Sequence, residues 1–294
     1  MTDSFLYDWC LISGRSVPKP VYHDNDTNQD AYGSWHDEAG RAVIVTCDGA
    51  GSLPKSREGA RLVADTIVSE GRSVLERFTL SGESEADALK LREELLSVLS
   101  VAMNTVWAAK DSAKMGCTVA AALLCEGVFA YVTLGDAFVL VGDYAGSPPK
   151  YQSYVEMWDA PNITTFTTSD DPRVIASCGT DATWCMVASD GMKNPLVKAA
   201  TAESGEVLED SLFREGVAGE PPLYLVLFSP THTDDFLAHL EREKYLDDDT
   251  TFVMAGCLNK PPAGGLSMVA ESDEFVIVPG DYGFIDGFRL KLDD

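Results

Sequence analysis

The order of the apolar segments limits the possible folds of this chain more than any other feature. Residues 55–77 and 85–110 carry apolar side chains at three- and four-residue spacing, which predicts two long helices in succession. Three short apolar runs follow at 116–124, 127–135 and 137–144, and their glycine-containing connections are typical of antiparallel hairpins. Helices in pairs and strands in succession predict an α+β fold with two antiparallel sheets, and disfavour a parallel βαβ order.

Weaker signals complete the expected elements. Further strands are expected at 5–13, 41–47, 182–189 and 250–258, with less regular ones at 151–158 and 162–168. Helical regions are expected at 193–217 and 231–244, and two short strands near 267–278 and 283–292. Because the linker-like stretches are short, we predict one domain over residues 1–259. Residues 260–294 would form a C-terminal extension that adds strands to the same domain or docks a partner.

Composition restricts the class of partner. The chain has 47 acidic and 22 basic residues and a formal net charge of −25. Binding to nucleic acid or to an anionic membrane requires basic residues that neutralise phosphates, so neither partner is expected. No apolar stretch approaches the length of a membrane span, and the N-terminal residues lack a signal-peptide pattern. Seven cysteines without a C-x-x-C pair predict buried thiols in a reducing compartment, so we expect a cytoplasmic protein.

Aspartates recur where strand-like runs end or begin, namely at Asp30, Asp48, Asp136, Asp190 and the run 247–249. A single aspartate at such a place is usually a turn former or a helix cap. Five such places in one chain suggest that carboxylates converge on hard divalent cations, which prefer oxygen ligands. Glycine after Asp48 leaves a backbone carbonyl open to an ion because no Cβ intervenes. Two adjacent ions can polarise a phosphate and activate a water for in-line attack.

Six short motifs then occur in an order that a known family shares: NQDA, CDGAG, GCTVAAALL, LGDAFVLV, ASDGM and DDDTTFVM. From about residue 11 to 258, the chain resembles the bacterial branch of the metal-dependent protein phosphatases, the type 2C serine/threonine phosphatases. The resemblance implies a central antiparallel β-sandwich flanked by pairs of helices, in α-β-β-α layers. It also implies two Mn²⁺ or Mg²⁺ ions at one end of the sandwich. A metal-activated water would hydrolyse phosphoserine and phosphothreonine in proteins without a phosphoenzyme.

The resemblance assigns roles by position. Asp48 would bridge both ions, and Gly49 would offer its backbone carbonyl. Asp190 and one aspartate of the 247–249 run would complete the ligands of one ion. Asp30 would hold water beside the ions, so Asp30, Asp48 and Asp190 are the expected catalytic residues.

The last motif leaves its metal ligand open. Alignment of the family pattern on Thr251 selects Asp248, whereas alignment on Thr250 selects Asp247. Gln29 stands where many family members have a glutamate, and it is kept as a candidate ligand that would place less charge on one ion.

Two further positions depart from the family pattern. The phosphate-binding arginine would fall at Asn25, so Arg15 and His23 become candidates to bind phosphate, with other nearby cations as alternatives: Lys55 and Arg57. Asp136 matches a ligand of a third ion in some members, but its usual acidic partner is replaced by Asn194. Two ions are therefore expected, and Asp136 is a candidate ligand of a third.

Other functions fit less well. A nucleotide-binding P-loop would need glycine where Pro54 stands, and proline lacks the N–H that such a loop directs at phosphate. A phosphatase of the haloacid-dehalogenase class would need an aspartate at Thr46. The main alternative is a catalytically silent module of the same fold that binds phosphoproteins. The expected partners are phosphorylated proteins, the substrates of a serine/threonine kinase, in bacterial signalling.

Overall fold

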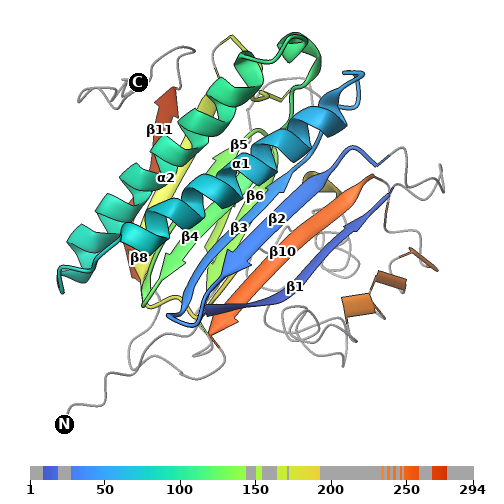
Figure 1. The fold of residues 1–294 in the computed structure, drawn as a ribbon. Helices are drawn as coiled ribbons and strands as arrows, with labels where there is room; N and C mark the ends of the chain where they lie inside the picture. The colour runs from blue at the N-terminus through green and yellow to red at the C-terminus, as the bar shows by residue number, and fades with distance from the viewer. Residues whose placement is uncertain are drawn as a thin grey trace.

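The computed structural model describes residues 9–18, 28–143, 150–153, 164–170, 172–192, 248–257 and 267–276, and the short pieces 233–234, 237–238, 241–242 and 246. Here two antiparallel sheets lie together, and two long helices cover the outer face of one of them (Figure 1). The predicted α+β fold is confirmed. The helical region expected at 193–217 lies outside the described residues, and the one expected at 231–244 is described only in short helical pieces.

Every strand pair in the two sheets is antiparallel. Within the described residues, the first sheet has five strands, in the order β1 (Trp9–Val17), β10 (Thr250–Cys257), β9 (Trp184–Ala188), β6 (Phe138–Gly142) and β7 (Lys150–Ser153). The second has six strands, in the order β11 (Ser267–Val276), β8 (Arg173–Thr180), β5 (Val128–Leu134), β4 (Val119–Cys125), β3 (Arg41–Cys47) and β2 (Ala31–His36).

One predicted hairpin is not formed. β4 and β5 pair as expected, but β6 pairs with β7 and β9 in the other sheet. The chain crosses between the sheets at Gly135, whose φ of +76° lies in the left-handed region that glycine tolerates. Asp136 follows this crossing directly, so it lies where the two sheets meet.

Helices α1 (Ser56–Arg77) and α2 (Ser84–Trp107) bury one face each against the six-stranded sheet, as their spacing predicted. Their inward side chains are fully buried, among them Ile67, Leu95 and Leu99. Full burial of each such side chain contributes roughly 1.5–3 kcal/mol relative to exposure. Within the described ranges, no helix is both long and apolar enough to cross a membrane.

Side chains of β3 alternate between two cores. Val43, Val45 and Cys47 pack beneath the helices, whereas Ala42 and Ile44 pack between the two sheets. Successive side chains of a strand point to opposite faces, so the next residue, Asp48, continues the row that faces the other sheet. A carboxylate at this strand end can therefore meet groups from the five-stranded sheet.

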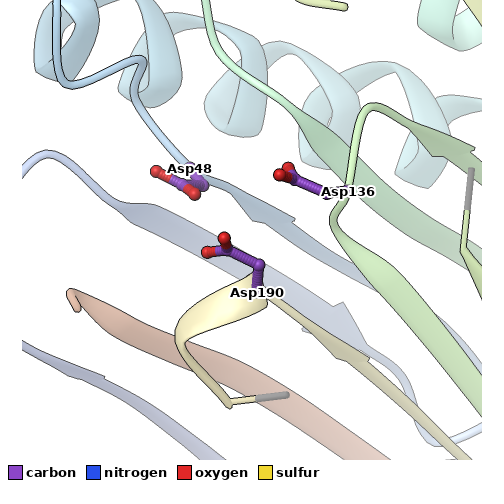
Figure 2. Close-up of side chains that lie close together, drawn as sticks. All are labelled: Asp48, Asp136 and Asp190. Carbon is purple, nitrogen blue, oxygen red and sulfur yellow. The ribbon is translucent and has the colours of Figure 1, made fainter. Parts of the chain in front are cut away.

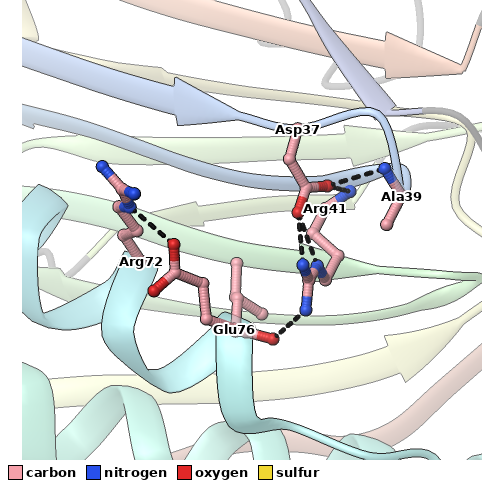
Figure 3. Close-up of polar contacts among 6 residues, drawn as sticks. Asp37, Ala39, Arg41, Arg72 and Glu76 are labelled. Carbon is pink, nitrogen blue, oxygen red and sulfur yellow. Dashed lines mark hydrogen bonds and ion pairs between the residues drawn. The ribbon is translucent and has the colours of Figure 1, made fainter.

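The opposite end of β3 is tied to the end of α1 (Figure 3). Arg41 Nε donates a 2.8 Å hydrogen bond to Asp37 Oδ2, and Arg41 Nη1 donates a 2.6 Å bond to the Leu75 carbonyl. Arg72 and Glu76 form a 2.8 Å ion pair on the same last turns of the helix. These contacts fix the β2–β3 turn on α1, far along the strand from Asp48.

Several strand predictions need correction. β2 and β8 were not expected, and the strand predicted at 162–168 is wrong, because its described residues form an irregular segment and a turn. Part of the extension at 260–294 forms β11, which pairs with β8. The strand expected at 283–292 lies outside the described residues, and the division of the chain at residue 259 stays a prediction.

Candidate metal centre

Asp48, Asp136 and Asp190 bring their carboxylates together (Figure 2). One oxygen atom from each lies within 4.8 Å of the other two. Asp48 follows β3 and Asp136 lies between β5 and β6, whereas Asp190 begins a short 3₁₀ helix, η2 (Asp190–Met192), after β9. Strand ends from both sheets therefore meet at this point. Asp136, expected only as a ligand of a third ion, belongs to this close group.

Gly49 occupies a position where two backbone segments approach closely. A Cβ here would lie 2.6 Å from the Gln29 carbonyl oxygen and 3.0 Å from the Ser56 carbonyl carbon. The Asp48 carbonyl oxygen accepts a 2.8 Å hydrogen bond from the Thr118 amide, which fixes the backbone beside the carboxylate. Among the described residues, nothing donates a hydrogen bond to the Gly49 carbonyl oxygen, which is therefore available to an ion.

Asp30 lies beside this group and is only 8% exposed. Neither of its carboxylate oxygens has a hydrogen-bond partner in the described part of the chain. Burial raises the pKa of Asp30 to about 7. The nearby side chains of Thr251, Asp48 and Ser189 offset part of this shift, and the charge of Asp249 adds to it. Burial, followed by the charges of Asp30 and Asp190, also raises the pKa of Asp48 well above its ordinary value. Such buried and mutually repelling carboxylates are destabilising unless protons or cations neutralise them.

Asp248 and Asp249 face different parts of the site. Burial raises the pKa of Asp190 to about 6, and neighbouring charges, that of Asp248 among them, contribute. Asp249 instead accepts a 2.9 Å hydrogen bond from the Gln29 amide through Oδ2. The charge of Asp248 thus acts on Asp190, and Asp248 as a metal ligand stays a prediction. Asp247 lies outside the described residues.

Gln29 is held between the last motif and the start of α1. Its Nε2 donates a 2.8 Å hydrogen bond to Ser56 Oγ, and the Ser56 hydroxyl in turn donates a 3.0 Å bond to the Leu53 carbonyl. These bonds leave Gln29 Oε1 as the side-chain atom available to an ion. Ser56 was not anticipated as a contributor to the site, since nothing in its sequence context distinguishes it from a helix-start serine.

The two candidates for phosphate binding remain predictions. Arg15 Nε donates a 2.8 Å hydrogen bond to Asp234, and Arg15 Nη1 donates a 2.8 Å bond to the Gly14 carbonyl. The ion pair with Asp234 raises the pKa of Arg15, so this cation is already partly neutralised by a carboxylate. His23 lies outside the described residues.

Sequence reasoning missed the residues that join the strands beside Asp190. Ser189 Oγ accepts a 2.9 Å hydrogen bond from the Thr251 amide, and the Ser189 amide donates a 2.8 Å bond to the Thr251 carbonyl. Thr251 Oγ1 also donates a 2.7 Å bond to Ser16 Oγ on β1. These contacts fix β9, β10 and β1 next to the carboxylates. The serine of ASDGM was the only signal that pointed to them.

The set of available ligand atoms fits a hard divalent cation. The grouped atoms are carboxylate oxygens, with the Gly49 carbonyl nearby, and oxygen ligands suit Mg²⁺ and Mn²⁺. Cys47 is adjacent to Asp48 in sequence but packs in the core beneath the helices. Burial raises the pKa of Cys47 well above its usual value, so its thiol stays protonated and is a poor ligand.

Comparisons with known proteins agree with this geometry. The sequence pattern of the protein phosphatase 2C family matches residues 20–217. No curated protein matches the chain. Three bacterial structures have a similar fold, each at 17% sequence identity. A bacterial serine phosphatase has a TM-score of 0.54, and the match covers 84% of this chain and 98% of that chain. The serine/threonine phosphatase Stp1 from Staphylococcus aureus has a TM-score of 0.53 with coverages of 84% and 95%, and PppA from Pseudomonas aeruginosa has a TM-score of 0.52 with coverages of 86% and 99%. The chain therefore belongs to the protein phosphatase 2C family of metal-dependent serine/threonine protein phosphatases.

Proposed function

We propose that this chain hydrolyses phosphoserine and phosphothreonine in proteins at a centre of two Mn²⁺ or Mg²⁺ ions. The convergence of Asp48, Asp136 and Asp190 beside the buried Asp30 supports this most strongly. Such ions, when bound, polarise the phosphate and activate a water for direct attack on phosphorus. The aspartates that a silent relative would lose are present, so the silent alternative is not favoured.

Each residue of the site has a separate proposed role in binding these ions. Asp48 would contact both, and the backbone carbonyl of Gly49 would add an oxygen beside it. Asp190 and Asp248 would hold one ion. Asp30, whose oxygens lack partners in the described part of the chain, would accept hydrogen bonds from ordered water and orient it toward the phosphate.

The cysteines support a reducing compartment. The six cysteines whose side chains are described are all buried, and none of them forms a disulfide with another described cysteine. We therefore propose a cytoplasmic enzyme of bacterial signalling that acts on phosphoproteins made by a serine/threonine kinase.

Asp48→Asn tests the proposed centre. It keeps the size of the side chain but removes one negative charge where the ions would share a ligand. We expect Mn²⁺-dependent hydrolysis of p-nitrophenyl phosphate and of a phosphothreonine peptide to fall by at least about 100-fold. Asp65→Asn, the same change on the exposed face of α1, should keep full activity. Equal activity in EDTA, or a trapped phosphoenzyme, would contradict the proposed mechanism.

A further inference from the structure

Basic residues of this acidic chain gather in two short segments, 55–61 and 110–114. These twelve residues hold five of the chain's 22 lysines and arginines but only two of its 47 acidic residues. The clustering is unusual in a protein whose formal net charge is −25. We call this surface the basic patch and define it by Lys55, Arg57, Arg61, Lys110 and Lys114.

The two segments of the basic patch are in direct contact. The Lys55 amide donates a 3.1 Å hydrogen bond to the Lys114 carbonyl. Asp111 then holds both ammonium groups, with Lys55 Nζ at 2.7 Å and Lys114 Nζ at 3.3 Å from its carboxylate oxygens. A single carboxylate thus orients two cations. The charge of Glu58 also acts on Lys55, so the positive charge available to a further anion comes from the whole patch, in which five basic residues outnumber two acidic ones.

The basic patch is accessible to a partner. The side chains of Lys55 and Lys114 are 36% and 54% exposed, and Lys110 is exposed as well. Arg57 and Arg61 lie one turn apart on the solvent side of α1, because the intervening inward positions are buried. The two segments that carry the five cations lie at the end of the molecule where α1 begins and α2 ends (Figure 1).

A short backbone ladder connects the basic patch to the carboxylates. Three hydrogen bonds join the two segments in succession: Asp48 with Thr118 (2.8 Å), Ala50 with Gly116 (3.0 Å) and Lys55 with Lys114 (3.1 Å). Lys114 precedes Thr118 by four residues, which span at most about 14 Å even when fully extended. A peptide whose phosphate lies at the carboxylate group can therefore reach the basic patch with about four to six further residues.

We propose that the basic patch binds an acidic segment of the phosphoprotein substrate, located a few residues from the phosphorylated side chain. This inference rests on the proposed function and specifies its substrate class. Opposite charge at the rim of a binding site accelerates association and selects among partners. An acidic protein segment fits better than nucleic acid, because the rest of this chain would repel a long polyanion.

A charge reversal on the basic patch tests the proposal. The substrates are two phosphothreonine peptides that carry either glutamates or glutamines about four to six residues from the phosphate. We expect the wild-type enzyme to show a higher kcat/KM for the glutamate peptide. In the double variant Arg61→Glu, Lys110→Glu, this preference should fall about tenfold, mainly through KM. Added salt should reduce the wild-type preference in the same direction.

Arg77→Glu is the matched control. It reverses one charge, as Arg61→Glu alone does, on an exposed side chain at the other end of α1, about 24 Å from Arg61 along the helix. An equal loss of preference in Arg77→Glu, or no wild-type preference at all, would overturn the proposal. Tighter binding of a single-stranded oligonucleotide than of the glutamate peptide would also overturn it.

A binding measurement separates this inference from the proposed function. Fluorescence anisotropy of the labelled glutamate peptide with the full-length chain reports docking without requiring turnover. If the double variant binds the peptide more weakly and no variant hydrolyses it, the basic patch binds the acidic segment but the proposed reaction is refuted. Unchanged binding in the double variant, with normal hydrolysis, would refute the basic patch alone.

Discussion

Gly49 lies where two backbone segments approach closely, and its carbonyl is a candidate metal ligand. Replacing it therefore tests whether this close approach is needed for stability and for the response to Mn²⁺. In Gly49→Ala, the new Cβ would lie 2.6 Å from the Gln29 carbonyl oxygen, a backbone atom that cannot move alone. We expect the free energy of unfolding to fall by about 1–3 kcal/mol and the response to Mn²⁺ to weaken. Urea denaturation with and without Mn²⁺ measures both effects.

Gly51→Ala is the control for this substitution. A Cβ at Gly51 would meet only Gln29 Oε1, at an ordinary distance of 3.6 Å. This variant should unfold at nearly the wild-type urea concentration. If both alanine variants behave alike, steric crowding is not the reason for glycine at position 49.

The sequence predicted individual ligands better than the contacts between them. Asp48 and Asp190 were found because each directly follows an apolar strand and precedes glycine. The bond between Gln29 and Ser56 joins residues 27 positions apart, and that between Gln29 and Asp249 joins residues 220 apart. Such pairs depend on sheet register, which a single sequence does not reveal. The ion pair that engages Arg15 was unforeseen for the same reason.

At the scale of elements, two leucines on different faces of α2 test which face contributes more to the free energy of unfolding. Leu95 is fully buried against the six-stranded sheet, whereas Leu89 on the same helix is 38% exposed. Leu95→Ala should lower the free energy of unfolding by about 2–5 kcal/mol, because it leaves a cavity in the core. Leu89→Ala should cost less than about 1 kcal/mol, and urea denaturation compares the two. Similar losses in both variants would show that this face is not the buried one.

The elements that were predicted correctly have strong patterns, and the errors have physical causes. α1 and α2 repeat apolar residues over many turns, so their bounds were close to those observed. The threonine-rich segment at 162–168 has high β-propensity, yet Thr167 Oγ1 accepts a 3.2 Å hydrogen bond from the Cys117 amide. Ser169 Oγ likewise accepts a 2.9 Å bond from the Phe166 amide. Side-chain oxygens here satisfy backbone donors, which competes with strand formation.

At the scale of the whole molecule, the sandwich is what concentrates negative charge. It brings strand ends from two sheets to one point, and the chain as a whole already carries a net charge of −25. Folding without cations must therefore bury carboxylates that repel one another. Ions that bind the folded state and not the unfolded chain would offset the repulsion between these carboxylates. Stability, metal binding and pH are therefore coupled.

This coupling predicts a pH dependence of the metal-free protein. The pKa of Asp30 is about 7 in the folded state, against about 3.9 for an unfolded aspartate, so the folded protein binds more protons between these values. The free energy of unfolding should therefore fall as pH rises from about 4 to 7, by on the order of a few kcal/mol. Thermal unfolding in EDTA across this range measures the decline.

Mn²⁺ should remove most of that decline, because bound ions favour the ionised carboxylates that protons otherwise neutralise. With Mn²⁺ at about 100 times its dissociation constant, the stabilisation is about 2.7 kcal/mol, or roughly 5–10 °C in Tm, and should be larger at high pH than at low pH. Asp30→Asn should flatten the metal-free profile, whereas Asp65→Asn on the exposed face of α1 should leave it unchanged. A metal-free stability that rises with pH over this window, or a Tm indifferent to Mn²⁺, would mean that these carboxylates do not form a metal centre.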